Sequence, residues 1–289
     1  MSIIKFVQRK SMKIRPSGRS SDFITPSFGF GCLYKCAYCY MRRHVPNGLT
    51  VANNPETIIR AVYKHEEKLG KKKPNQTHDK YWTYDISCNE DFALHIKHHD
   101  WKFIFNAFKY HNRIMATFAT KHVNKTLLNY NPSGKIRIRF SLMPQEYSTI
   151  LEPNTSKITQ RIEAVNDFIE AGYDVHLNFS PVIEAVDAIE KYTVLFQEVD
   201  KIIKQEHKSK VKAEVIFLTH NQKMHELNLK ENPLAETLLW KPGLQEEKTT
   251  SYGQKGVLRY KRIIKGMMIH KFKELHNSII PWNTIRYIF

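Results

Sequence analysis

Apolar residues recur along most of the chain with two alternating periods, one typical of helices and the other typical of strands. The helical period predicts helices over residues 55–69, 101–110, 123–130, 158–171, 192–206 and 263–277. Strand-like runs lie over residues 81–87, 113–120, 135–142, 174–183, 213–218 and 284–289. Because helices of about 10–15 residues separate most of the strands, the pattern predicts βαβ units and a parallel sheet.

About six such units indicate an α/β fold, and they fit a partial (β/α)6 TIM-like barrel better than a flat doubly wound sheet. Residues 242–261 are polar and glycine-containing, which is typical of a loop or a β-hairpin. We therefore expect a basic N-terminal arm over residues 1–24, the barrel over residues 25–240, and a C-terminal extension of hairpin, helix and closing strand over residues 241–289. In barrels of this kind the functional site lies at the C-terminal ends of the strands.

The charge balance adds a prediction about the partner. Lysine and arginine number 45 against 28 aspartates and glutamates, which gives a net charge of +17. A surplus of this size favours a polyanion, most simply nucleic acid, and the 12% of aromatic residues could stack on bases. Solubility or a lysine-rich composition is the alternative explanation. The three lysines at residues 71–73 are expected to lie in a solvated loop.

The sequence also bears on the compartment. No run approaches the roughly 18 apolar residues of a membrane span, and the N-terminus lacks the apolar core of a secretory signal. The 4 cysteines, three of them close together, suit a reducing compartment better than a disulfide framework. We therefore expect a cytoplasmic protein without a membrane partner. The basic residues 8–21 fit either an ordered arm or a flexible tail that binds phosphates.

Three cysteines, Cys32, Cys36 and Cys39, form the motif C-x3-C-x2-C. Thiolates are the ligands of iron–sulfur clusters, and three of them leave one iron of a [4Fe–4S] cluster open for a substrate. The spacing resembles that of radical S-adenosylmethionine (radical SAM) enzymes, in which the open iron binds S-adenosylmethionine. The alternative is a zinc site completed by Cys88 or His44, although zinc ligands usually come as two separated pairs.

Polar residues follow several predicted strands. Cys88 follows the strand at residues 81–87, and its weak S–H bond could return a hydrogen atom to a carbon radical. It could equally be a small buried apolar residue. Lys121 and Ser141 lie at strand ends, where they could contact the carboxylate and ribose of S-adenosylmethionine, or simply begin a helix and cap a turn. Tyr38 and Tyr40 flank the third cysteine and could relay a radical or pack around the loop.

Taken together, the chain resembles the spore photoproduct lyase family of radical SAM enzymes. The resemblance runs from about Thr25 to the C-terminus, and it depends on the shared order of several short strings. These are Ala37-Tyr38-Cys39-Tyr40, Asp85-Ile86-Ser87-Cys88, Phe118-Ala119-Thr120-Lys121, Arg137-Ile138-Arg139-Phe140-Ser141, Glu152-Pro153-Asn154-Thr155, Arg161-Ile162-Glu163-Ala164, Ala171-Gly172-Tyr173, Ser251-Tyr252-Gly253-Gln254-Lys255-Gly256 and Ile285-Arg286-Tyr287-Ile288-Phe289.

The resemblance implies a lyase that uses a 5′-deoxyadenosyl radical to reverse a thymine-dimer lesion in DNA. It implies a [4Fe–4S] cluster on the three cysteines, S-adenosylmethionine as cofactor, and a reducing electron donor of the flavodoxin or ferredoxin type. Cys88 would donate hydrogen, Tyr38 or Tyr40 would relay it, and Lys121 and Ser141 would bind the cofactor. Four cations near the predicted hairpin would hold DNA phosphates: Lys255, Arg259, Lys261 and Arg262. The alternative is that they only make the hairpin basic and well solvated.

The chain departs from the family pattern outside the predicted radical-generating core. Its N-terminal region is short, residues 68–80 look like a basic insertion, and residues 238–250 match only loosely. These departures leave the substrate open. The alternatives are a radical SAM enzyme that modifies another base of DNA or RNA, and a non-enzymatic zinc protein that binds nucleic acid.

Overall fold

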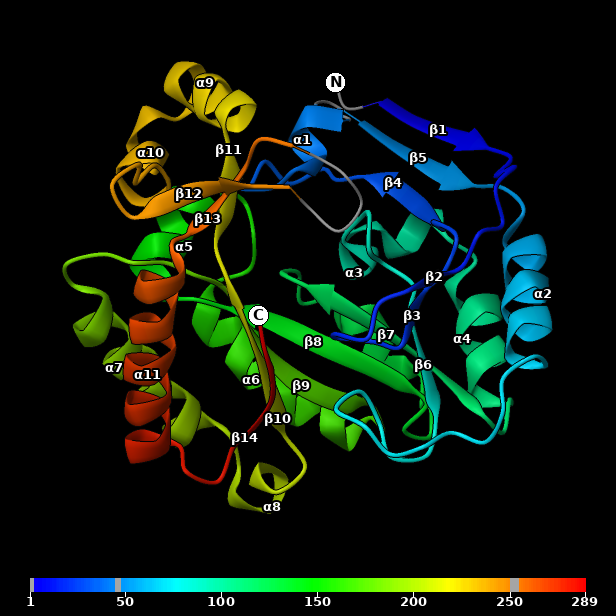
Figure 1. The fold of residues 1–289 in the computed structure, drawn as a ribbon. Helices are drawn as coiled ribbons and strands as arrows, with labels where there is room; N and C mark the ends of the chain where they lie inside the picture. The colour runs from blue at the N-terminus through cyan, green and yellow to red at the C-terminus, as the bar shows by residue number, and fades with distance from the viewer. Residues whose placement is uncertain (1–2, 45–47, 250–254) are drawn as a thin grey trace.

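The computed structural model describes residues 3–44, 48–249 and 255–289, and an eight-stranded curled sheet dominates it (Figure 1). The strand order is β14-β10-β9-β8-β7-β6-β3-β2, and every neighbouring pair is parallel except β2 with β3. The strands are β2 (Arg15–Pro16), β3 (Phe23–Ile24), β6 (Trp82–Asp85), β7 (Ile114–Thr120), β8 (Ile136–Leu142), β9 (Asp174–Val182), β10 (Lys212–Phe217) and β14 (Thr284–Ile288). The predicted partial barrel is confirmed.

Helices connect the parallel strands, and α4 and α6 pack against β7, β8 and β9 (Figure 1). The longer helices are α2 (Pro55–Glu66), α4 (Trp101–Lys109), α6 (Ile158–Glu170), α7 (Ala188–Ile202), α9 (Gln222–Glu231) and α11 (Arg262–Ile279). The shorter ones are α1 (Met41–His44), α3 (Phe92–His95), η1 (Ile96–His98), η2 (Lys125–Asn129), α5 (Gln145–Leu151), α8 (Gln205–Lys208) and α10 (Pro233–Leu239). Across the described ranges, no helix has the length and apolar character needed to span a bilayer.

Two helix predictions need correction. The helix expected over residues 123–130 is the 3-10 turn η2, because Asn124 caps it and Pro132 follows closely. The helix expected from residue 192 begins earlier, at Ala188, and ends at Ile202. The hairpin is confirmed as β12 (Gln245–Lys248) and β13 (Val257–Tyr260), to which β11 (Thr219–Asn221) adds a third antiparallel strand.

Residues 3–23 form ordered structure. Strand β1 (Ile3–Val7) pairs with β5 (Gly48–Ala52) in a small sheet that also holds β4 (Gly29–Gly31), while β2 extends the barrel sheet. Arg286 on β14 donates a hydrogen bond of 3.2 Å to the carbonyl of Ser20, which links the two edges of the open barrel. The division into an arm, a barrel and an extension stays a prediction.

Charged residues fill much of the interior enclosed by the curved sheet. Strand β8 turns Ile138 and Phe140 toward the helices and Arg139 toward the interior, as strand alternation requires. Arg139 binds Glu214 at 2.8 Å and Asp85 at 2.6 Å, on strands that are not its neighbours, so these side chains meet inside the curve of the sheet. We call this group the barrel floor: Asp85, Arg137, Arg139, Asp174, His176, Glu214 and Arg286.

The lysine tract at residues 71–73 differs from its prediction. Lys71 and Lys73 are exposed, but Lys72 is buried and its ammonium group lies 2.7 Å from the Asp22 carboxylate. Thr77 Oγ1 accepts a second hydrogen bond of 3.2 Å from it. The central lysine therefore joins the basic insertion to the N-terminal segment and is unavailable to a partner.

Candidate functional site at the barrel mouth

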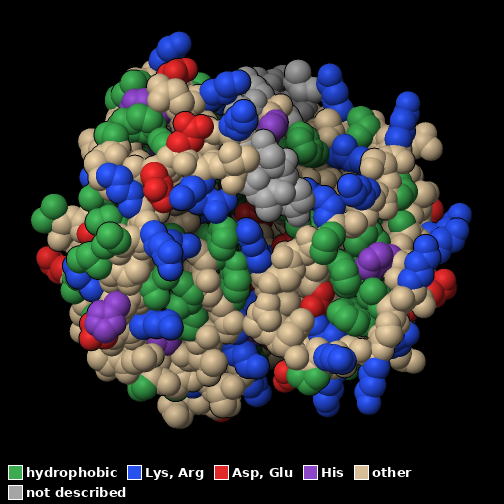
Figure 2. Space-filling view, viewed as in Figure 1, with side chains coloured by type: hydrophobic (Ala, Val, Ile, Leu, Met, Phe, Trp, Pro, Cys, Tyr) green, Lys and Arg blue, Asp and Glu red, His purple; other side chains and the backbone are tan. Residues whose placement is uncertain are grey.

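A cavity of about 350 Å³ opens at the C-terminal ends of the barrel strands. It brings together the predicted cluster ligands, the predicted cofactor contacts and the predicted radical residues, although they come from distant segments. The face seen in Figure 2 is hollowed near its centre, and Lys and Arg side chains stand along the edge of the hollow. The predicted residues that line the cavity are Cys32, Cys36, Cys39, Tyr38, Tyr40, Cys88, Lys121 and Ser141.

The cysteine loop is shaped by a glycine and held by three other segments. Gly31 has φ of +115°, and a Cβ there would lie 2.3 Å from the Gly48 carbonyl oxygen, so the chain can enter the loop only through glycine. The Ala37 amide donates to the Leu151 carbonyl at 2.8 Å. The Ala37 carbonyl in turn accepts a hydrogen bond of 2.9 Å from Asn228 Nδ2. These contacts fix the loop between Cys36 and Cys39.

The donor set suits a cluster better than a single zinc ion. Among all described His, Cys, Asp and Glu residues, the only set of three with donor atoms within 4.8 Å of one another is His220, His225 and Glu236. Three thiolates on one short loop match the three irons of a [4Fe–4S] cluster that take protein ligands, whereas zinc ligands usually come as two separated pairs.

Burial controls the protonation of the cysteine loop. It raises the pKa of the Cys32 thiol to about 12, and it raises the pKa of Cys36 well above its usual value. Thiolates gathered in such a place need strong positive charge, and iron in a cluster supplies it. The residues present therefore fit a [4Fe–4S] cluster held by Cys32, Cys36 and Cys39.

Asp91 joins two strand ends beside the cavity. One carboxylate oxygen caps α3, accepting from the Leu94 amide at 3.1 Å, and also accepts from Thr120 Oγ1 at 2.7 Å. The other oxygen accepts from the Lys121 amide at 2.8 Å. The backbone at Lys121 is therefore fixed relative to the loop that carries Cys88. The sequence analysis did not single out Asp91, because its role depends on a strand thirty residues away in the chain.

The Lys121 side chain turns toward Tyr38, with its ammonium group 5.7 Å from the ring centroid. Although burial lowers the pKa of Lys121, the nearby Glu152 raises it above its usual value, so the side chain stays charged. Glu152 also accepts a hydrogen bond from the Tyr38 hydroxyl and pairs with Arg161 at 2.9 Å. Tyr38 is thus held in a buried charged network.

Ser141 lies beside an amide that the sequence analysis missed. Asn178 Nδ2 donates 3.2 Å to Ser141 Oγ, and the buried Oδ1 of Asn178 has no partner within the described residues. Both side chains line the cavity. A pattern in the sequence could have shown this, because polar residues occupy every second position of the otherwise apolar β9, at His176, Asn178 and Ser180.

Cys88 is exposed to solvent in the cavity. The surrounding walls still desolvate it enough to raise the pKa of the thiol, and Asp85 adds to this effect, so it keeps its hydrogen at neutral pH. The Tyr40 hydroxyl donates 2.8 Å to the Cys88 carbonyl, and Arg15 Nη2 lies 3.9 Å from the sulfur. Arg15 comes from the N-terminal segment, which the sequence analysis did not connect with Cys88.

The four predicted phosphate contacts do not form one group. Lys255, Lys261 and Arg262 are exposed, and Lys261 donates 2.8 Å to the Gly243 carbonyl. Arg259 instead lies 5.4 Å from the ring centre of Phe289, and its Nε is buried without a partner among the residues that the structure describes. The family string before the hairpin includes residues 251–254, and these four lie outside the described part of the chain.

Two further cations join Arg259 over the same ring. Arg19 lies 3.7 Å and Lys265 4.9 Å from the Phe289 ring centre. We call Arg19, Arg259 and Lys265 the rim cations, and none of them forms an ion pair with a described residue. Phe289 pairs through its backbone with both neighbours of Ile216, which lines the cavity. The rim cations therefore lie near β10, the strand that contributes Ile216 to the cavity, although they are not among the residues that line it.

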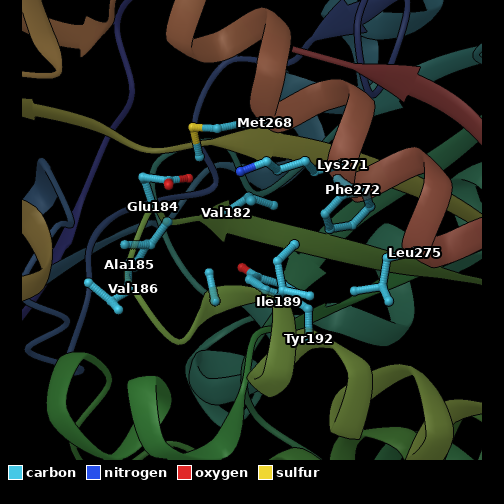
Figure 3. Close-up of a pocket in the computed structure, with 12 residues that line it drawn as sticks. Val182, Glu184, Ala185, Val186, Ile189, Tyr192, Met268, Lys271, Phe272 and Leu275 are labelled. Atoms are coloured by element: carbon cyan, nitrogen blue, oxygen red, sulfur yellow. The ribbon is translucent and has the colours of Figure 1, made fainter.

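A second cavity of about 140 Å³ lies between α7 and α11 (Figure 3). Its lining is mostly apolar, including Ile189, Tyr192 and Phe272, with Glu184 and Lys271 at its edge. It contains none of the predicted site residues. The candidate site is therefore the cavity at the barrel mouth.

Comparison with known proteins agrees with this geometry. The family model described as spore photoproduct lyase matches residues 2–289. Spore photoproduct lyase of Bacillus subtilis (strain 168) is 29% identical over 214 residues, which cover 72% of this chain and 59% of that protein. The enzyme of Geobacillus sp. (strain Y412MC61) is 26% identical over 195 residues, covering 66% and 54%. The chain thus aligns with less than two thirds of either relative.

Solved structures support the fold. A spore photoproduct lyase complexed with dinucleoside spore photoproduct matches with a TM-score of 0.87 at 20% identity, over 99% of this chain and 82% of that one. A mutant with bound AdoMet and dinucleoside spore photoproduct matches with the same TM-score of 0.87 at 19% identity. On the family match across residues 2–289, this chain belongs to the spore photoproduct lyase family.

Proposed function

We propose that this protein is a radical SAM lyase that reverses a thymine-dimer lesion in DNA. The observation that carries the proposal is the single cavity that joins Cys32, Cys36 and Cys39 to Cys88, Lys121 and Ser141. Family membership and the solved complexes of relatives with the dinucleoside lesion support the same activity. The proposed setting is the cytoplasm, with a flavodoxin-like or ferredoxin-like electron donor.

The three cysteines would hold a [4Fe–4S] cluster, which with S-adenosylmethionine supplies a 5′-deoxyadenosyl radical. Lys121, a half-buried cation that lines the cavity, suits the carboxylate of S-adenosylmethionine. Ser141 and the unpartnered amide oxygen of Asn178 suit ribose hydroxyls, which both donate and accept hydrogen bonds.

Cys88 would return a hydrogen atom to the thymine radical left after the bond between the two bases breaks. A donor of this kind must carry its hydrogen, and desolvation by the surrounding walls keeps Cys88 in the thiol form by raising its pKa. The hydroxyl of Tyr40, which donates to the Cys88 carbonyl, could give a hydrogen atom to the Cys88 thiyl radical, which restores the thiol and leaves the radical on Tyr40. The Tyr38 hydroxyl donates its hydrogen bond to Glu152, so we assign the relay of the hydrogen atom to Tyr40.

The rim cations would hold the DNA backbone at the mouth of the barrel. A base must leave the stack to enter a cavity of about 350 Å³, and phosphate contacts at the edge would stabilise the extruded strand. Arg259 and Lys265 crowd the same ring without a carboxylate partner among the described residues, which favours an anionic ligand there. Lys255, Lys261 and Arg262 remain predicted outer contacts.

The test is anaerobic turnover with iron and sulfide reconstituted, dithionite as reductant, S-adenosylmethionine, and DNA carrying the spore photoproduct. We expect 5′-deoxyadenosine and restored thymine, both followed by mass spectrometry. Cys39→Ala should abolish both products because a cluster ligand is lost. Cys88→Ala should still form 5′-deoxyadenosine but lose clean thymine repair, which separates the two cysteine roles within one experiment.

Other outcomes would point to the alternatives. If 5′-deoxyadenosine forms while the lesion persists, the protein is a radical SAM enzyme that acts on another base, of DNA or RNA. If clean repair survives in Cys88→Ala, the hydrogen-donor role is wrong. Zinc at the cysteine loop without iron or labile sulfide would instead support a non-enzymatic nucleic-acid-binding protein.

A further inference from the structure

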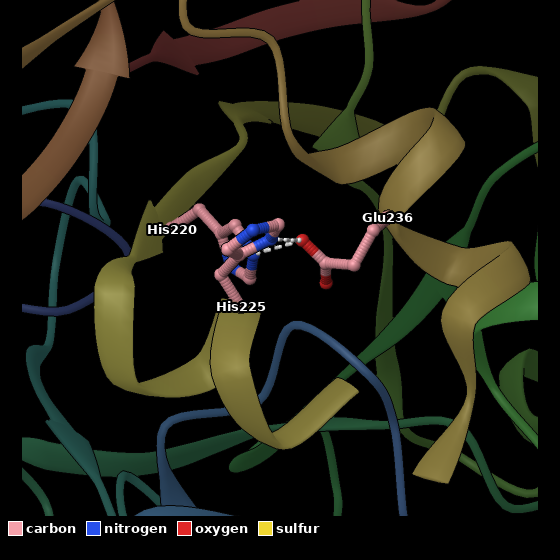
Figure 4. A group of neighbouring side chains, drawn as sticks. All are labelled: His220, His225 and Glu236. Atoms are coloured by element: carbon pink, nitrogen blue, oxygen red, sulfur yellow. Dashed lines mark hydrogen bonds and ion pairs between the residues drawn. The ribbon is translucent and has the colours of Figure 1, made fainter. Parts of the chain in front are cut away.

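A cluster of two histidines and one glutamate lies apart from the cysteine loop, between β11, α9 and α10 (Figure 4). His220 lies on β11, His225 on α9 and Glu236 on α10, so three consecutive elements each contribute one side chain. Figure 4 shows both imidazole rings turned toward the glutamate carboxylate. One carboxylate oxygen lies 3.1 Å from His220 Nε2 and 2.5 Å from His225 Nδ1.

We propose that His220, His225 and Glu236 form a binding site for a divalent transition-metal ion, most simply zinc, with water as the fourth ligand. Two histidines and a glutamate are an established donor set for zinc, with bonds of about 2.0–2.2 Å. Tetrahedral geometry then places the donor atoms roughly 3.4 Å apart. The three donor atoms here already lie within 4.8 Å of one another, so side-chain shifts that change a separation by at most about 1.4 Å would suffice.

Hydrogen bonding alone does not satisfy this cluster. The His220 side chain is fully buried, yet its Nδ1 has no partner within the described residues. The nitrogen that faces the carboxylate is Nε2, so the ring offers Nε2 to an ion while Nδ1 stays without a protein partner among the described residues. The two rings also share a single carboxylate oxygen, an arrangement that a bridging cation would stabilise.

The surroundings hold the three side chains as the outer shell of a metal site does. His225 stacks on Trp240, with ring centres 3.8 Å apart and planes 14° from parallel. Asn228 Nδ2 donates to the second carboxylate oxygen of Glu236 at 2.5 Å. Such outer contacts orient metal ligands and commonly change metal affinity by about 10–100-fold when removed.

The same Asn228 connects this site to the cysteine loop. Its Nδ2 also donates to the Ala37 carbonyl at 2.9 Å, and its Oδ1 accepts 2.7 Å from Arg42. On the other side, His220 lies on the strand that pairs with β13 of the hairpin, opposite Leu258. A bound ion would therefore brace the hairpin and the cysteine loop together.

The test measures zinc and iron separately in the full-length protein. To remove the thiolates as competing ligands, the measurement is repeated in Cys32→Ala/Cys36→Ala/Cys39→Ala, with zinc affinity from competition with a chromophoric chelator. We expect about one zinc per chain in both proteins. His225→Ala or Glu236→Gln should weaken zinc binding at least about 100-fold, beyond the effect of losing an outer contact.

The matched control is His270→Ala, which removes an exposed histidine on α11 and should leave zinc binding unchanged. His225→Cys restores a metal ligand and should recover binding, which separates ligand loss from misfolding. Absence of zinc, or equal zinc affinity in His225→Ala and the parent, would overturn the proposal and leave a purely hydrogen-bonded cluster. These outcomes do not depend on lyase activity, so the two proposals can fail independently.

Discussion

The barrel floor and the rim cations use positive charge in opposite ways. In the floor, Arg139 meets Glu214 and Asp85, and Arg286 meets Glu214 again, so each buried cation has a carboxylate. At the rim, Arg259 and Lys265 share the Phe289 ring, and no ion pair with a described residue neutralises them. The comparison shows that net charge counts both kinds, whereas only unmatched cations are available to a partner.

The physical reason lies in the surroundings of each group. Buried charges must be matched because desolvation costs several kcal/mol per ion. Where water still reaches the cations, it screens the repulsion between them, and an incoming phosphate can replace that water. Burial, and then Arg259 and Arg19, lower the pKa of Lys265, which is the effect expected where cations await an anion.

The largest effect should come from breaking the floor. Replacing Arg139 by leucine removes the ion pairs with Glu214 and Asp85 and leaves buried Glu214 paired with Arg286 alone among the described residues, which should cost about 3–5 kcal/mol of unfolding free energy. Urea denaturation of the cluster-free protein measures this. The exposed Arg262→Ala should change stability by less than about 0.5 kcal/mol. A loss below about 1 kcal/mol in Arg139→Leu would contradict the matched-charge account of the floor.

The next effect concerns the rim. Arg259→Ala/Lys265→Ala should weaken binding to lesion-bearing DNA about tenfold at moderate salt, because two phosphate contacts are lost. The slope of log affinity against log salt should become shallower by about 0.9 per contact. Unfolding free energy should barely change. An unaltered salt slope would remove the rim cations from the DNA interface.

A pH effect should distinguish the floor from the rim. Burial and the neighbouring Arg137 lower the pKa of His176 to about 3. The folded state then keeps His176 neutral while the unfolded state gains a proton below about 6.5, so stability falls as pH falls. Between pH 6 and 5 this group should cost about 1 kcal/mol.

His176→Asn removes the titrating group and should flatten that part of the stability profile, measured by urea denaturation at each pH. The rim variant should keep the wild-type profile. If His176→Asn loses stability between pH 6 and 5 as steeply as the parent does, another group is responsible.

The smallest effect should come from the exposed lysines at the opposite end of the barrel. Lys71→Ala/Lys73→Ala removes two positive charges, as many as the rim variant removes, but from a surface away from the cavity. Charges farther from the DNA than the Debye length of about 8 Å are screened, so affinity should change less than about twofold. A salt slope as shallow as that of the rim variant would show that only total charge matters.

Much of the fold could be predicted because periodicity reports burial directly. The strands near residues 114–120, 136–142 and 174–182 and the helix at 158–170 appear where their patterns placed them. The small sheet of β1, β4 and β5 could not be predicted, because its short strands carry no clear period. The burial of Arg137 and Arg139 on β8 also could not be predicted, because it depends on their acidic partners Asp174 and Glu214 on other strands.

Sequence alone determined the local chemistry of this protein: the spacing of Cys32, Cys36 and Cys39, the order of helices and strands, and the family strings along the chain. The reason is that a motif of eight residues and a period of two or 3.6 are fixed by covalent geometry. Tertiary structure alone decided which cations are matched, which tyrosine lies beside Cys88, and that His220, His225 and Glu236 meet. Those outcomes depend on contacts between segments far apart in the chain, whose distances only packing of the barrel sets.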